Sequence, residues 1–239
     1  MEKMTMKKFI ILILAFALLL AGCAGSQNEP KAETEPREQE EITAPLTETE
    51  ASAVVQTAAK IYPLNDPVME NVSDAILSVS LEEGDVYVDD AGKMQMDLKI
   101  YSYDKYDMVD ISMLKAGDIL VTASGEVEVL ALERRGDGSV AVNGGLLEDG
   151  FDLVTDDDGI FYERGYNDAK NWHEVGEATI RVSVDFVCYD NSDLDAGEAV
   201  YYPGDFLNGD IAIYDFNPSN TTIRTENGQI VEMYRVYTP

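Results

Sequence analysis

Alternating hydrophobic and polar positions dominate the chain from about residue 90 onward. The segment MQMDLKI, residues 94–100, alternates apolar side chains with Gln, Asp and Lys, and this period of two predicts a half-buried strand. The segment EVEVLALER, residues 126–134, follows the same pattern less strictly. The strongest strand signal is ATIRVSVDFVCYD, residues 178–190, whose predicted inward face consists of Ile180, Val182, Val184, Phe186 and Cys188.

Turn signals separate these apolar segments. Asn227-Gly228 lies between TTIRTE and QIVEMYRVY, and an Asn-Gly pair between two such runs predicts a tight hairpin. RRGDGS, residues 134–139, and TDDDG, residues 155–159, are further turn candidates. Frequent turns between short strands favour antiparallel pairing.

Helical periodicity is scarce. Asp66-Pro67 could cap and begin a helix that runs to about Leu77, but AILSVSL, residues 75–81, is equally typical of a strand. The fold class expected for residues 61–239 is therefore all-β, a mainly antiparallel barrel or sandwich with little helix. Its length suits one medium domain or two small subdomains.

Three stretches resemble one another at a spacing of about 33 residues. They begin at Leu81, Leu114 and Leu147, and each has a Gly three residues later, followed by apolar residues near an Asp. One interpretation is an internal repeat. The other is that Gly and Asp form similar turns before strands.

The first residues have a different composition, with Lys3, Lys7 and Lys8 followed by an apolar run of 12 residues, 9–20. A membrane-spanning helix needs roughly 20 apolar residues, so this run is typical of a signal peptide, although an uncleaved N-terminal anchor is an alternative. Leu20-Ala21-Gly22-Cys23 matches the lipobox at each position.

The segment thus resembles a bacterial lipoprotein signal peptide. The resemblance implies that a diacylglyceryl group is attached to the Cys23 thiol through a thioether and that a peptidase cleaves between Gly22 and Cys23. Residues 1–22 would then be removed, and Cys23 would begin the mature protein. Two or more acyl chains give stable anchoring, so we expect a protein tethered to the outer face of the cell membrane.

Residues 23–60 are expected to form that tether. Between residues 24 and 59 the chain has eight acidic and two basic residues, three prolines and almost no large apolar side chains. Such a composition predicts an extended, disordered spacer, with a short helix conceivable at 52–60. Its Glu, Thr and Pro content resembles that of surface lipoproteins of Gram-positive bacteria.

The folded region is strongly acidic. Residues 61–239 contain 37 acidic and 11 basic side chains, within a chain of net charge −29. Such a surface repels nucleic acids and anionic lipid head groups, so neutral, cationic or metal partners are expected.

Few residues are suited to covalent or transition-metal chemistry. Cys188 lies on the apolar face of the strongest strand, where a free thiol behaves as a small hydrophobe, and we expect it to be buried and reduced. His173 is the single histidine, which excludes two-histidine zinc motifs, and no catalytic residue is assigned. Trp172 and His173 are the candidates for contact with a ligand.

Acidic loops are the remaining candidates for a site. Calcium takes oxygen ligands from loops of this kind, although neither loop follows the EF-hand register. The candidate ligands are Asp156 and Asp158 in the first loop and Asp190, Asp193, Asp195 and Glu198 in the second.

Three functional hypotheses follow. The first is a non-catalytic module of the cell envelope that binds a protein or a glycan and needs no cofactor. The second is a calcium-dependent surface domain. The third is a small hydrolase that acts on an envelope or extracellular polymer through a pair of carboxylates.

Overall fold

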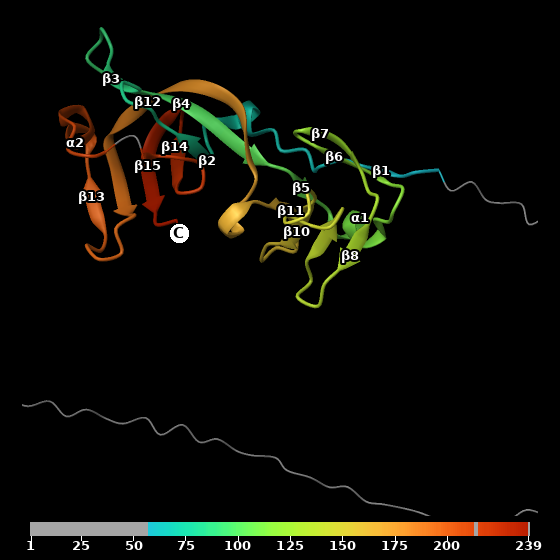
Figure 1. Cartoon of the computed structure of the whole chain (residues 1–239). Coiled ribbons are helices and arrows are strands. Elements are labelled where there is room, and N and C mark those ends of the chain that lie inside the picture. The colour runs from blue at the N-terminus through green and yellow to red at the C-terminus, as the bar shows by residue number, and fades with distance from the viewer. Residues whose placement is uncertain (1–56, 213–214, 239) are drawn as a thin grey trace, which may run out of the picture. The chain divides into compact units, whose positions relative to one another are not determined.

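The computed structural model describes residues 57–212 and 215–238, which form an all-β fold with two short α-helices (Figure 1). The expected signal peptide, the expected lipidation and cleavage site at Gly22 and Cys23, and residues 24–56 of the expected tether lie outside this part of the chain. The elements are β1 Lys60–Ile61, η1 Val68–Asn71, β2 Ile76–Ser80, β3 Val86–Val88, β4 Met94–Tyr103, β5 Lys105–Tyr106, α1 Met108–Met113, β6 Ile119–Thr122, β7 Gly125–Glu128, β8 Leu132–Arg134, β9 Val140–Val142, β10 Phe151–Thr155, β11 Phe161–Arg164, η2 Tyr166–Asp168, β12 Trp172–Asn191, β13 Ala199–Tyr201, α2 Pro203–Asn208, β14 Thr221–Glu226 and β15 Gln229–Val236.

Five strands pair in a closed ring. β12 is antiparallel to β4 along its first half and parallel to β15 along its second half, and Arg181 is paired on both sides. From β15 the antiparallel pairing continues to β14, then to β2, and returns to β4. β3 pairs with β4, and β13 pairs with β12 (Figure 1). The expected all-β, mainly antiparallel fold is therefore confirmed, and five of its strands close a small ring.

The interior of the ring is apolar because its strands alternate in burial. The residues of β4 alternate strictly between buried and partly exposed, as its sequence predicted. The buried cluster comprises Leu77, Val79, Leu81, Met94, Met96, Leu98, Ile100, Ile180, Val182, Phe186, Cys188, Phe206, Ile211, Phe216, Ile223, Ile230 and Met233.

One residue of the strongest predicted strand points the wrong way. Val184 was expected on the inward face of β12, but it is 81 % exposed. The regular pairing with β15 is interrupted between Val182 and Val187, and this bulge turns Val184 and Asp185 outward. Phe186 and Cys188 are again part of the core.

The remaining strands surround a second apolar cluster. β1, β6 and β7 form a three-stranded sheet, and β5, β11, β10, β9 and β8 form a five-stranded sheet in that order. Helix α1 begins at Asp107, whose side chain accepts a hydrogen bond from the Val109 amide, and it contributes the buried Ile111. The cluster contains Tyr106, Ile111, Leu114, Leu120, Val129, Val140, Val142, Phe151, Leu153 and Phe161.

The predicted turns and the ambiguous segment are resolved. Asn227 and Gly228 both have positive φ, at 51° and 72°, as a hairpin turn between β14 and β15 requires. The segment after Pro67 is a single 3₁₀ turn followed by β2, so the strand interpretation is confirmed. Asp66 does not cap a helix, because its carboxylate accepts hydrogen bonds from Ser102 and Lys105.

The fold begins slightly before residue 61. The Ala59 amide donates to Asp118 Oδ1 at 2.9 Å, and the Ile119 amide donates to the Ala59 carbonyl at 2.8 Å. Lys60 and Ile61 then pair with β6 in parallel. The expected helix over 52–60 is absent from the described residues 57–60, where β1 begins.

Two of the three similar stretches form the same turn. In each, the Asp that follows Gly84 or Gly117 accepts a hydrogen bond from the amide three residues before it, and both glycines have positive φ. Gly150 has a different conformation, and its Cα lies against the carbonyl oxygen of Val142. The similarity therefore reflects turn chemistry at two of the three positions.

Candidate functional site

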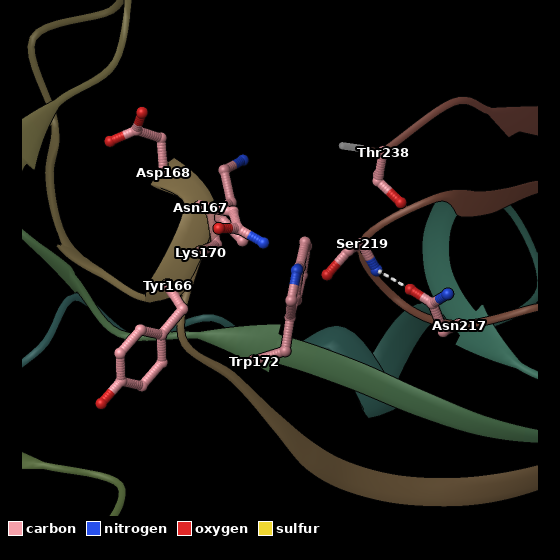
Figure 2. Close-up of a pocket in the computed structure, with 9 residues that line it drawn as sticks. Tyr166, Asn167, Asp168, Lys170, Trp172, Asn217, Ser219 and Thr238 are labelled. Carbon is pink, nitrogen blue, oxygen red and sulfur yellow. Dashed lines mark hydrogen bonds between the residues drawn. The ribbon is translucent and has the colours of Figure 1, made fainter.

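A pocket of about 550 Å³ lies where the start of β12 meets two turns that are distant in the sequence (Figure 2). One wall is the turn between β11 and β12, and the other is the segment that precedes β14. Figure 2 shows the Trp172 side chain standing between these walls. The lining residues are Tyr166, Asn167, Asp168, Ala169, Lys170, Trp172, Asn217, Ser219 and Thr238.

Trp172 is held in place by the aromatic residue on the neighbouring strand. It is the first residue of β12 and lies opposite Tyr103, the last residue of β4. The two rings meet edge to face with centroids 5.1 Å apart. Because both residues are at strand ends, the indole is partly exposed and remains available to a ligand.

Lys170 lies among three aromatic rings. Its ammonium is 4.1 Å from the centroid of Tyr103 and donates a hydrogen bond to the Tyr103 hydroxyl at 2.9 Å. The same ammonium is 5.6 Å from the centroid of Trp172 and 5.7 Å from that of Tyr162. Each such cation–π contact contributes about 0.5–2 kcal/mol, so together they hold Lys170 at the pocket edge.

A second lysine supports Tyr103 from another direction. Lys105 Nζ is 4.9 Å from the Tyr103 ring centroid and 2.6 Å from Asp66 Oδ2. Burial alone would raise the pKa of Asp66, but the hydrogen bonds from Lys105 and Ser102 bring it below its ordinary value. Asp66 therefore remains ionised and fixes Lys105 behind the aromatic cluster.

The turn between β11 and β12 has a strained and well-defined backbone. Asn167 and Asp168 both lie in the left-handed region, with φ of 56° and 60°. The Gly165 amide donates a hydrogen bond to the Ala169 carbonyl at 2.7 Å and closes the turn, and Arg164 donates to Asp168 Oδ1 at 3.3 Å. Short polar side chains tolerate this conformation, so the turn presents Asn167 and Asp168 beside the pocket.

The opposite wall is a turn fixed by its own amides. Asn217 Oδ1 accepts a hydrogen bond from the Ser219 amide at 3.0 Å (Figure 2). Asn220 Oδ1 accepts one from the Asn217 amide at 3.0 Å, and Asn217 Nδ2 donates to the Asp215 carbonyl. The exposed Ser219 hydroxyl therefore has a stable position on the side toward Trp172, with the Asn217 amide behind it.

The lining is suited to binding a polar ligand. An aromatic face, side-chain amides, hydroxyls and one ammonium can contact a molecule with an apolar face and many hydroxyl groups. Asp168 is the single carboxylate among the lining residues, whereas acid–base hydrolysis of a glycoside uses two.

Trp172 and His173, the two residues expected to contact a ligand, lie in different surroundings. Trp172 is central to the pocket, but His173 is not among its lining residues. Successive side chains of a strand point to opposite faces, so His173 points to the other face of β12 from Trp172. His173 is paired across the strands with Ser102 of β4, which is buried.

The acidic loops use their carboxylates to form turns. Asp156 Oδ1 accepts hydrogen bonds from the amides of Asp158 and Ile160, and Asp193 Oδ1 accepts them from Asp195 and Ala196. Across residues 57–212 and 215–238, no group of three or more His, Cys, Asp or Glu side chains is arranged to hold a metal ion.

Asp190 and Glu198, two further calcium candidates, have partners on neighbouring segments. Asp190 is buried in an ion pair with Arg235, at 3.2 Å, and Glu198 accepts a hydrogen bond from Asn191 at 3.2 Å. Each of these carboxylates already has a structural partner, which explains its position without a cation.

Cys188 is fully buried in the ring and unpaired, as predicted. Burial raises the pKa of its thiol to about 12, so the thiolate is scarce at neutral pH. This environment is that of a core side chain.

Sequence reasoning missed most of the pocket. Lys170 has no distinguishing neighbours in the sequence, and its role depends on Tyr103 and Tyr162, which lie on other strands. Asn217-Pro218-Ser219-Asn220 is recognisable as a turn, but nothing local to it indicates that it faces Trp172.

Comparison with known proteins leaves the site to be interpreted from its own chemistry. Within the described part of the chain, no helix has the length and apolar character needed to span a bilayer. No protein-family model, curated protein or solved structure matches this chain.

Proposed function

We propose that this protein is a lipid-anchored extracytoplasmic binding module without catalytic turnover, and that the Trp172 pocket binds a glycan of the cell envelope. One observation carries the proposal: the single tryptophan of the chain stands in an open pocket whose polar side chains are amides, hydroxyls, the Asp168 carboxylate and the Lys170 ammonium, which packs on aromatic rings.

The size and polarity of the pocket support a glycan. A volume of about 550 Å³ falls within the range of roughly 300–1,000 Å³ that is usual for small-molecule sites. A sugar ring has an apolar C–H face that can pack on an indole and hydroxyl edges that pair with amides. Trp172 offers the first contact, while Asn217, Ser219 and Asn167 offer the second.

The charge of the protein narrows the class of glycan. The net charge of −29 opposes the approach of polyanions, although Lys170 provides one local positive charge. An uncharged or basic glycan therefore suits the site better than an acidic one.

The N-terminal segment supports the proposed location. Leu20-Ala21-Gly22-Cys23 would place lipid on Cys23, and the acidic segment that follows would separate the folded region from the membrane. A binding module on such a spacer could reach polymers beyond the lipid head groups.

Binding is favoured over the two alternatives by specific contacts. A hydrolase acting in the Trp172 pocket would need a second carboxylate there beside Asp168, and the lining of that pocket contains none. In the acidic loops, Oδ1 of Asp156 and Oδ1 of Asp193 already accept hydrogen bonds from their own turns, and no group of three or more acidic, His or Cys side chains in the described part of the chain is arranged to hold a metal ion.

The test uses Trp172 as its own reporter. The full-length chain in detergent is titrated with linear oligosaccharides of N-acetylglucosamine and glucosamine, and Trp fluorescence is followed. We expect a saturable change, because Trp172 is the only tryptophan. In calorimetry, Trp172→Ala should weaken binding by at least about tenfold.

Tyr62→Ala is the matched control. Tyr62 is 59 % exposed and does not line the pocket, so its removal should leave affinity unchanged. Unaltered affinity in Trp172→Ala, or failure of every tested glycan to bind, would contradict the proposal.

A further inference from the structure

A second cavity adjoins the Trp172 pocket. Its volume is about 660 Å³, and it shares the side chains of Tyr166, Asn167 and Asp168 with the first cavity. These three residues therefore form a ridge with a hollow on each side. The remaining lining residues are Glu133, Arg135, Gly144, Leu146, Leu147, Glu148, Asp152, Arg164 and Gly165.

The ridge is low and accessible. Tyr166 is 78 % exposed, and Figure 2 shows its ring pointing away from Trp172. The left-handed backbone at Asn167 and Asp168 and the contact between Arg164 and Asp168 fix the position of the ridge. A chain-like ligand that rests on Trp172 could thus continue across the ridge past the Tyr166 ring.

One wall of the second cavity consists of charged side chains held in place by ion pairs. Asp152 is 4 % exposed and pairs with Arg135 at 3.0 Å and with Arg164 at 2.5 Å. Its other oxygen, Oδ1, is buried without a hydrogen-bond partner in the described part of the chain, and Gly145 lies against it. The two guanidinium groups remain about a third exposed, so their outer N–H groups can donate to a ligand.

The opposite side of this cavity is apolar and acidic. Leu147 is 94 % exposed and offers an apolar side chain to a ligand in this cavity. Glu133 and Glu148 line the cavity together with Asp152 and Asp168, so carboxylates outnumber the two arginines. The cavity therefore favours uncharged or basic groups over anions.

We infer that the two cavities form one extended site for a linear glycan, with one unit on Trp172 and further units beyond the Tyr166 ridge, and that the preferred chain is uncharged or basic. This inference rests on the proposed glycan-binding function and specifies its ligand as a polymer segment. Two adjoining cavities are what a polymer segment needs, whereas a free monosaccharide would use the first alone.

A length series tests the inference. Calorimetry with the full-length chain compares a disaccharide and a hexasaccharide of N-acetylglucosamine. We expect the longer ligand to bind at least about tenfold more tightly, because it contacts both cavities. A polyuronate hexasaccharide should bind more weakly than either of the two chains.

Variants assign the effect to each cavity. Leu147→Ala combined with Glu148→Gln should reduce affinity for the hexasaccharide about tenfold and leave the disaccharide unchanged, whereas Trp172→Ala should weaken both. Glu83→Gln, an exposed carboxylate in another turn that lines neither cavity, is the control and should alter neither affinity.

The failures are distinguishable. Equal affinity for both lengths, with loss of both in Trp172→Ala, would overturn the extended site but keep the proposed function. Tight binding of the polyuronate would overturn the charge preference. If neither length binds, the proposed function itself fails.

Discussion

Two triads of charged side chains in this protein have the same arrangement with the signs of the charges exchanged. In the ring, Arg235 lies between Asp190 and Asp215, at 3.2 Å and 3.1 Å. In the five-stranded sheet, Asp152 lies between Arg135 and Arg164, at 3.0 Å and 2.5 Å. Each triad has a buried central group with two partners of opposite charge.

The triads differ in what their outer members face. Arg235 packs against the Phe216 ring at 4.8 Å, and Asp190 is as buried as Arg235 itself, so this pair joins β12 and β15 inside the protein. Asp215 is about half exposed, but neither Asp190 nor Asp215 lines either of the two cavities. Arg135 and Arg164 instead line the second cavity. The comparison teaches that the same chemistry is structural where the outer groups line neither cavity and is available to a ligand where they line one.

The largest effect is expected from breaking the triad centred on Arg235. Arg235→Met leaves Asp190 buried without its cation, so the free energy of unfolding should fall by about 3–5 kcal/mol, as measured by urea denaturation. Arg224→Met removes more exposed ion pairs with Glu226 and Glu232, which water and salt screen, so its loss of stability should be much smaller. Equal losses in the two variants would remove the distinction between enclosed and exposed pairs.

A smaller loss is expected in the open triad. Arg164→Met leaves Asp152 paired with Arg135, so the free energy of unfolding should fall by about 1.5–3 kcal/mol. The double substitution of Arg135 and Arg164 should cost more than the two single effects added together, because only then is Asp152 unpaired. Strict additivity in this double-mutant cycle would show that the arginines act independently.

The open triad should also make stability depend on acid. Burial alone would raise the pKa of Asp152, but hydrogen bonds from Arg164 and Arg135 hold it below its ordinary value. The stabilisation is therefore complete above the unfolded-state pKa, about 3.9, and is lost as the pH falls toward the lower folded-state pKa.

Asp152→Asn isolates this contribution. The difference in stability between wild type and variant should be constant above about pH 5 and should shrink below it, as followed by thermal unfolding at several pH values. A difference that grows on acidification would contradict the assigned direction.

The smallest effect is expected where a carboxylate only forms a turn. Asp193→Asn retains a side-chain oxygen that can accept from the amides of Asp195 and Ala196, so stability should change by less than about 0.5 kcal/mol. Glycan affinity should be unaltered, because Asp193 does not line either cavity. A marked loss of binding in this variant would show that the acidic loop takes part in ligand binding.

The sequence was informative where structure depends on near neighbours. The period of two in β4 and the Asn227-Gly228 turn were predictable because adjacent residues determine them. Val184 was placed on the wrong face because a bulge depends on the partner strand, β15. The closure of the ring was likewise inaccessible, since it requires β12 to pair with both β4 and β15.

In the candidate site, too, the residues that stand out locally were predictable, and those whose role depends on distant strands were not. Trp172 stood out as the single tryptophan, and it does lie in the pocket. Lys170 did not stand out, because its significance comes from rings on β4 and β11. The turn-forming role of Asp156 and Asp193 was not predictable, because the sequence does not reveal which carboxylates accept hydrogen bonds from their own turns.

The short parallel ladder at β1 has a mechanical consequence. Tension applied through the preceding residues enters the fold at Lys60 and Ile61, which are held by two residue pairs with β6 and by the hydrogen bond of Ala59 to Asp118. The ring begins only at β2, so peeling β1 away leaves every ladder of the ring intact. A force applied to the chain before Lys60 should therefore first extend it by the few residues of β1, while the part of the protein that carries Trp172 stays folded.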